Sequence, residues 1–285
     1  MSEFIDRATC SRFRASILQE HGIGQHAFPQ AIKTKLEDII LIMVNESTRL
    51  LASRAITMVM SGDTMTPFNR TLLSVRNIKY SIRVEKLPDD CLDGGSMETE
   101  LITRSLAPLF ENFGNEIMFR WTSVSDEKAI SDEKPDAIMS IIDSASFGRT
   151  IAYGEVKPEV QAVNRNLVNK VLDRLGRLAK GAIDTNDTTL AFAFLVVGSH
   201  ATFYLVHRHQ SMYSMPEIGH VQLPMSVKEI PIYPAQVNVV TNVIAAFDKV
   251  VASPSHGFID HPSTLSTDQV RCVCRIYPIK YLLFV

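Results

Sequence analysis

Two short apolar segments joined by a polar turn, within residues 134–158, constrain the fold most, because both carry acids at positions where a buried strand would carry an apolar residue. Side chains in a strand alternate between its two faces. Glu155 and Lys157 therefore share one face of the second predicted strand. We predict that the two strands pair as a hairpin with residues 143–149 as its turn. Asp136, at the start of the first strand, would then converge on Glu155 with Lys157 beside them.

This convergence indicates a particular chemistry. Two carboxylates and a lysine suit a hard divalent cation with a water or a phosphate next to it, because Mg²⁺ prefers oxygen ligands and retains water. We therefore expect Asp136 and Glu155 to hold Mg²⁺ (or Mn²⁺). Lys157 would complete a catalytic set by orienting the attacking water and offsetting charge on the phosphate.

The Pro135-Asp136 pair followed by Glu155-x-Lys157 resembles the signature of the PD-(D/E)XK nuclease-like superfamily. The resemblance is closest to a large, poorly characterised group of fungal proteins with that core, and it covers roughly residues 96–252. Four segments carry it: Arg120-Trp121, Pro135-Asp136-Ala137-Ile138, Tyr153-Gly154-Glu155-Val156-Lys157-Pro158 and Lys180-Gly181-Ala182-Ile183-Asp184. It implies an α-β-β-β-α-β (restriction-endonuclease-like) core and Mg²⁺-dependent hydrolysis of a nucleic acid, with DNA favoured over RNA.

A third acid is expected on a helix that begins near residue 96 and carries an apolar stripe. At 100° per residue, Glu98 lies about 40° from Ile102, on the buried side, whereas Glu100 lies almost opposite. A buried carboxylate needs a partner, and nucleases of the superfamily often bring a glutamate from this helix to the metal. We therefore predict Glu98 as a further metal ligand. In the alternative, Glu98 only stabilises the first turn of its helix.

Residues 164–183 predict a second helix, with a cationic stripe of Lys170, Arg174 and Arg177 displaced about 60° to 120° from its apolar stripe. These cations can extend into solvent from the border of a buried face, or they can bind the phosphates of a nucleic-acid backbone. Both interpretations stay open. His207 and His209 share a strand face, but without a third nitrogen ligand we expect a solvated pair rather than a metal site.

The rest of the chain predicts an α/β protein with a mixed sheet. The continuously apolar residues 190–197 indicate a central strand, and residues 201–207 an edge strand. We expect a mainly helical N-terminal segment over 1–90, including a helix over 33–60 and a strand over 78–84. The nuclease-like core would cover 91–222, a helix packing on that core 223–252, and a flexible tail 253–285.

Composition narrows the class of function. A net charge of −2 over 285 residues gives no overall attraction to nucleic acid, so any such surface is a local patch. Four scattered cysteines indicate no disulfide framework, and no apolar run is long enough to span a membrane. We expect an intracellular protein, nuclear or cytoplasmic, whose N-terminal helices pack against the later core or self-associate. In the alternative, these helices bind a protein partner. A catalytically inactive binding module, or a purely structural Glu155–Lys157 ion pair, are the alternatives to a nuclease.

Overall fold

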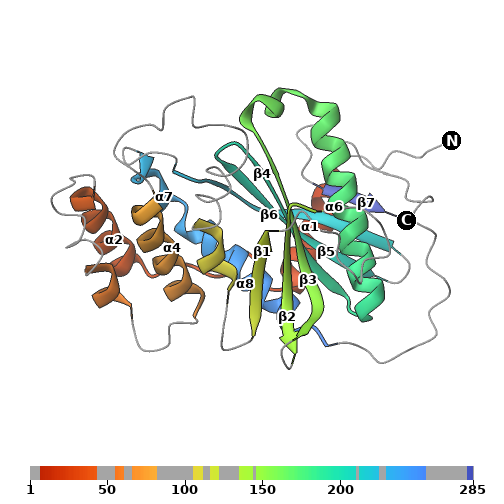
Figure 1. Cartoon of the computed structure of the whole chain (residues 1–285), viewed down its shortest axis with the longest axis horizontal. Coiled ribbons are helices and arrows are strands. Elements are labelled where there is room, and N and C mark those ends of the chain that lie inside the picture. The colour runs from red at the N-terminus through yellow and green to blue at the C-terminus, as the bar shows by residue number, and fades with distance from the viewer. Residues whose placement is uncertain are drawn as a thin grey trace.

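The computed structural model describes residues 7–43, 55–60, 66–81, 105–111, 116–121, 135–143, 146–209, 212–224, 229–254 and 281–284. Within them, one seven-stranded sheet follows the order of the chain (Figure 1). Its strands are β1 (Ile117–Trp121), β2 (Ala137–Asp143), β3 (Ser146–Lys157), β4 (Leu190–Val197), β5 (His200–His209), β6 (Met212–Gln222) and β7 (Tyr281–Phe284). All neighbours pair antiparallel except β3 and β4, which are parallel. The predicted α/β architecture with a mixed sheet is therefore confirmed.

Helix α6 (Arg165–Asn186) makes the crossover between the two parallel strands, after a short 3-10 turn, η4 (Glu159–Val163). Asn164 caps the helix, since its side-chain oxygen accepts a hydrogen bond from the N–H of Leu167 at 3.2 Å. The helix ends at Asp187, whose φ of 47° is left-handed. Residues at the two ends of α6 therefore determine where the helix begins and ends.

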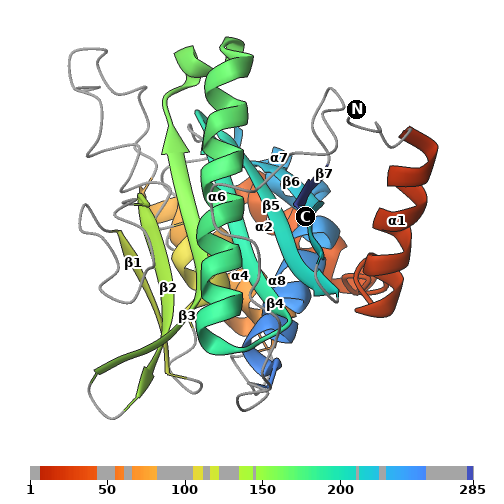
Figure 2. The same ribbon diagram turned by 90° about the vertical axis from the view of Figure 1, so that its right-hand side faces the viewer.

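The sheet is covered on both faces, which explains why β4 is apolar throughout. Phe192 and Phe194 of β4 belong to one core, and the alternate residues of the strand belong to the other. Helix α6 covers the second face (Figure 2). On the first face lie α8 (Val237–Ala252), preceded by α7 (Ile232–Ala235), and the N-terminal helices α1 (Arg7–Glu20), α2 (Gln30–Met43) and α4 (Pro67–Ser81).

A buried arginine ties α4 to α8 and to the helical residues before β1. Arg70 of α4 is 1% exposed, donates to the carbonyl of Leu109 at 3.1 Å, and pairs with Asp248 of α8. Residues 105–110, which contain Leu109, are helical. They precede β1, so the described elements follow the predicted order α-β-β-β-α-β up to β4.

Several predicted elements differ from the structure. The strand predicted over 78–84 is wrong for residues 78–81, which form the last turn of α4. Of the helix predicted over 33–60, residues 33–43 lie in α2 and residues 55–59 are helical, whereas residues 44–54 lie outside the described residues. The turn predicted over 143–149 is shorter, because β3 begins at Ser146.

The C-terminal side of the sheet is larger than predicted. β5 is not an edge strand, because β6 pairs with it and β7 pairs with β6. β7 also means that the tail expected to be flexible over 253–285 returns to the sheet at residues 281–284, whereas residues 255–280 lie outside the described residues.

Candidate active site

The structure brings Asp136, Glu155 and Lys157 together on the face of the sheet that α6 covers. β2 and β3 pair in the register Ala137–Gly154, so Asp136, directly before β2, reaches the level of Glu155. One carboxylate oxygen of Asp136, Oδ2, accepts from the N–H of Val156 at 2.8 Å and from Lys157 Nζ at 3.0 Å. Lys157 Nζ also lies 2.9 Å from Glu155 Oε2. The lysine ammonium therefore bridges the two carboxylates.

Glycine at position 154 is required by the packing beneath this site. A Cβ at Gly154 would lie 1.9 Å from the ring of Phe194 in β4. The absence of a side chain lets β3 approach this ring, while the adjacent Glu155 points to the opposite face.

Glu155 is the deepest member of the site. Its side chain is fully buried, whereas those of Asp136 and Lys157 are 37% and 20% exposed, so solvent reaches the cluster from their side. Arg174 of α6 forms a second ion pair with Glu155 Oε2. Glu155 Oε1 is buried and has no hydrogen-bond partner among the described residues. An unpartnered buried carboxylate oxygen is costly, and it leaves a donor atom for a cation.

The pKa shifts follow from this arrangement. Burial, helped by the charge of Asp136, raises the pKa of Glu155 in spite of Lys157 and Arg174. Burial also acts to raise the pKa of Asp136, but the bonds from Val156 and Lys157 hold it below its usual value. Burial opposes the charge of Lys157, yet the two carboxylates raise its pKa. Lys157 is therefore an ammonium at neutral pH, suited to donate hydrogen bonds rather than to accept a proton.

The predicted backbone-binding cations separate into different environments. Arg174 is turned toward Glu155 and serves as its counter-ion. Lys170, one turn earlier on α6, is exposed, and Arg177, one turn later, is partly buried. Only Arg174 is in the carboxylate cluster itself. Glu98, the predicted third acid, lies outside the described residues.

The donor set of the cluster fits Mg²⁺ or Mn²⁺. Asp136 and Glu155 offer only hard oxygen atoms, and Glu155 Oε1 is without a partner among the described residues. Lys157 and Arg174 already balance the charges of Asp136 and Glu155, so a bound cation would compete with Arg174 for Glu155. These two carboxylates could hold the ion.

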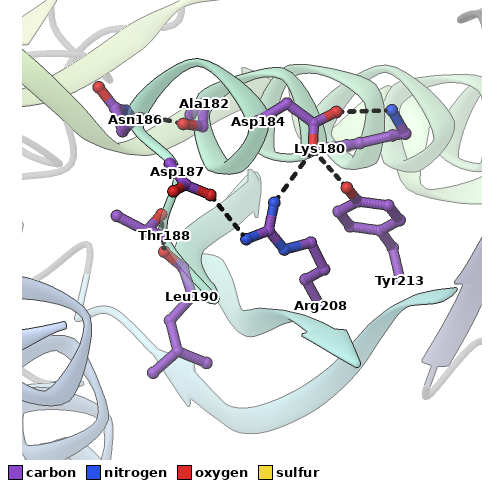
Figure 3. A network of polar contacts seen from close by, with 9 residues as sticks. All are labelled: Lys180, Ala182, Asp184, Asn186, Asp187, Thr188, Leu190, Arg208 and Tyr213. Carbon is purple, nitrogen blue, oxygen red and sulfur yellow. Dashed lines mark hydrogen bonds and ion pairs between the residues drawn. The ribbon is translucent and has the colours of Figure 1, made fainter. Parts of the chain in front are cut away.

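The Lys180–Asp184 segment, part of the family resemblance, has a different place in the structure (Figure 3). Asp184 accepts from the hydroxyl of Tyr213 and pairs with Lys180 at 2.7 Å. Arg208 of β5 lies 3.8 Å from Asp184 and 3.1 Å from Asp187. This network attaches the C-terminal half of α6 to β5 and β6, so the segment contributes to structure and lies outside the carboxylate cluster.

The expected solvated pair of His207 and His209 is wrong for His207. The side chain of His207 is only 6% exposed, and it lies against His21 at the end of α1, with ring centroids 5.0 Å apart. Burial, with smaller effects from His21, Glu20 and His209, lowers the pKa of His207 to about 4. Burial also lowers the pKa of His21. Both rings are neutral at pH 7. No local pattern indicates this contact, because His21 and His207 are far apart in the chain.

Comparison with family models, with curated proteins and with solved structures found no match. The resemblance to PD-(D/E)XK nucleases therefore stays a prediction from the motif. Among the helices of the described residues, none combines the length and apolarity that crossing a membrane requires.

Proposed function

We propose that the protein hydrolyses phosphodiester bonds of nucleic acid in a reaction that depends on Mg²⁺ or Mn²⁺. The observation that carries the proposal is the position of Lys157 Nζ, 3.0 Å from Asp136 Oδ2 and 2.9 Å from Glu155 Oε2. Two acids and a lysine on adjacent strands, open to solvent on one side, provide the groups that such a reaction needs.

Each residue has a separate role. Asp136 and Glu155 hold the ion, and Asp136 is itself fixed by the Val156 N–H. When bound, the ion supplies a Lewis acid and a nucleophile at neutral pH. Lys157 keeps its proton, and its ammonium orients the attacking water and stabilises the negative charge that grows on the phosphate oxygens.

The substrate is held by its backbone. Lys170 is exposed on α6, one helical turn from Arg174, and Arg177 continues the same face. An ion on the carboxylates would compete with Arg174 for Glu155, which would free its guanidinium to bind a phosphate. Such contacts position the strand without reading its sequence. We favour DNA as the substrate, bound with marked salt dependence.

The proposal is tested by plasmid nicking with Mg²⁺ or Mn²⁺. Wild-type protein should nick, and chelation should stop it. Lys157→Ala should lower the rate by about 100-fold or more, because it removes a donor to the developing charge. Lys35→Ala, at an exposed lysine of α2, is the matched control and should leave the rate unchanged. Equal nicking by wild type and Lys157→Ala would indicate another site or a contaminant.

A second candidate is a binding module on the same fold without turnover. The ion pair of Arg174 with Glu155 favours it, because the charges of the cluster can be balanced without a metal. Such a module would bind nucleic acid yet take up no Mg²⁺ in a calorimetric titration, which separates it from the hydrolase.

A further inference from the structure

A second group of metal-ligating side chains lies on the other face of the sheet. Glu20 and His21 end α1 and begin the turn that follows it, and His207 lies near the end of β5. One ligand atom from each of these three residues lies within 4.8 Å of the other two. The positive φ of Gly22, 63°, turns the chain directly after His21 and so presents its ring to β5.

Two nitrogen atoms in this group have no partner. Nδ1 of His207 and Nε2 of His21 are buried and make no hydrogen bond among the described residues. The His207 side chain is more than nine-tenths buried. Since buried polar atoms are nearly always satisfied, two orphan nitrogens on neighbouring rings require an explanation. A cation bound by both nitrogens would satisfy them.

The group is separate from the candidate active site. His207 pairs with Leu190 at the start of β4, whereas Glu155 pairs with Leu195 of the same strand. Five residues at about 3.3 Å each place the two sites about 17 Å apart along the strands. His207 also shares the face of Leu205, which belongs to the core on the α8 side, while Glu155 contacts Arg174 of α6.

We propose that Glu20, His21 and His207 bind one divalent transition metal of the Zn²⁺ class and thereby clamp the end of α1 to the sheet. Two imidazoles and one carboxylate are a ligand set typical of zinc and unsuited to Mg²⁺. Tetrahedral bonds of 2.0–2.1 Å put ligand atoms about 3.3 Å apart, so the site must contract on binding. Exposed Glu20 and half-buried His21 can move toward buried His207.

Other contacts already hold α1 near this position. Arg14 Nε donates to the carbonyl of Glu217 in β6 at 2.8 Å, and Asn242 of α8 accepts from the N–H of Gly24 at 2.9 Å. Ile17 of α1 is buried in the core on that side. A metal at His207 would add a link between the N-terminal helix and β5, so that its loss loosens α1 first.

The test is calorimetric titration of Zn²⁺ into the full-length, chelator-treated protein, with the Co²⁺ absorption spectrum as a second readout. The test protein carries Asp136→Asn and Glu155→Gln, which remove the other carboxylates as ligands. We expect one equivalent of Zn²⁺, and tetrahedral-type Co²⁺ bands that Zn²⁺ abolishes. Glu20→Ala and His21→Ala should each weaken binding by about 100-fold or more, since even outer-shell changes cost 10–100-fold.

His207→Ala should do the same, and the two less buried variants keep the test valid if this one does not fold. His200→Ala is the matched control, because His200 lies on the same strand but bonds to His220 at 3.1 Å. It should leave the affinity unchanged. The proposal is overturned if the test protein binds no Zn²⁺, or if Glu20→Ala and His21→Ala bind it as tightly as their parent.

Discussion

Asp136 accepts a hydrogen bond from the backbone N–H of Val156 at 2.8 Å, so the strand that carries Glu155 also fixes the other acid of the site. A backbone donor cannot rotate away as a side chain can. The separation of the two carboxylates is therefore set by the β2–β3 pairing itself. Lys157, which follows Val156, is delivered to the same point by strand alternation.

Replacing Asp136 by Asn separates the charge of this residue from its structural bond. The amide oxygen can still accept from Val156. We therefore expect the free energy of unfolding, measured by urea denaturation, to change by about 1 kcal/mol or less. Nicking should fall by about 100-fold or more because a ligand charge is lost. Asp136→Ala should lower both the free energy of unfolding and the rate of nicking. Unaltered nicking by Asp136→Asn would exclude this carboxylate from the reaction.

Gly154→Ala tests the close approach of β3 to Phe194. An added Cβ would lie 1.9 Å from that ring, so backbone or ring must move, and we expect destabilisation of about 2–4 kcal/mol. Gly181→Ala is the matched control. No atom lies within 4 Å of a Cβ there, and alanine favours a helix interior by about 0.5–1 kcal/mol. A lower urea midpoint for Gly154→Ala together with a higher one for Gly181→Ala would confirm the close contact of β3 with Phe194. Shifts of the same sign in both variants would contradict it.

The polar network of Figure 3 predicts a cost for losing one hydroxyl. Tyr213→Phe removes the donor to Asp184 while Lys180 and Arg208 stay in place. We expect a loss of about 1.5–3 kcal/mol in the free energy of unfolding, typical of a hydrogen bond to a charged group. Chemical denaturation measures it. A variant as stable as wild type would show that the Tyr213 bond contributes nothing.

His207 predicts a pH dependence of stability in the metal-free protein. Its pKa is lowered to about 4 by burial, from an ordinary 6.5, with Glu20, His21 and His209 facing it and Lys249 acting on His21. As pH falls from 6.5 to 4, the unfolded chain takes up the proton and the folded one does not. The contribution of neutral His207 to the free energy of unfolding is therefore complete above pH 6.5. It falls by on the order of 3 kcal/mol as the pH drops from 6.5 to 4.

Urea denaturation of wild type and His207→Phe at several pH values, with a chelator present, measures this loss. The variant should lose less stability between pH 6.5 and 4, because its ring does not titrate. Parallel profiles for the two proteins would contradict a buried neutral His207.

The parts of the fold that the sequence predicts well are those with local signals. The apolar run of β4 matches the predicted strand 190–197 residue for residue, and the Asn164 cap and Pro158 place the start of α6 and the end of β3. The convergence of Asp136, Glu155 and Lys157 follows from alternation along two strands. Each of these features is determined by residues that lie close together in the sequence.

The parts that sequence reasoning missed depend on distant contacts. β6 was not predicted, and it contains Pro216 and Gly219, two residue types that are uncommon inside strands. Gly219 makes room for Val243 of α8, which lies 2.6 Å from where a Cβ of residue 219 would be. The burial of His207 depends on α1, nearly two hundred residues earlier. Arg174 resembled a phosphate ligand, and only the packing of α6 on β3 reveals its ion pair with Glu155.

Uptake of a divalent cation by Asp136 and Glu155 separates the proposed hydrolase from a structural ion-pair cluster. It is measured most directly by calorimetric titration of Mn²⁺ into protein carrying His21→Ala, which removes the second candidate site. We predict binding that Glu155→Gln, added to that protein, weakens by about 100-fold or more, because one of two ligand charges is lost. No uptake of Mn²⁺, or equal affinity with and without Glu155→Gln, would contradict a metal-dependent active site at these residues.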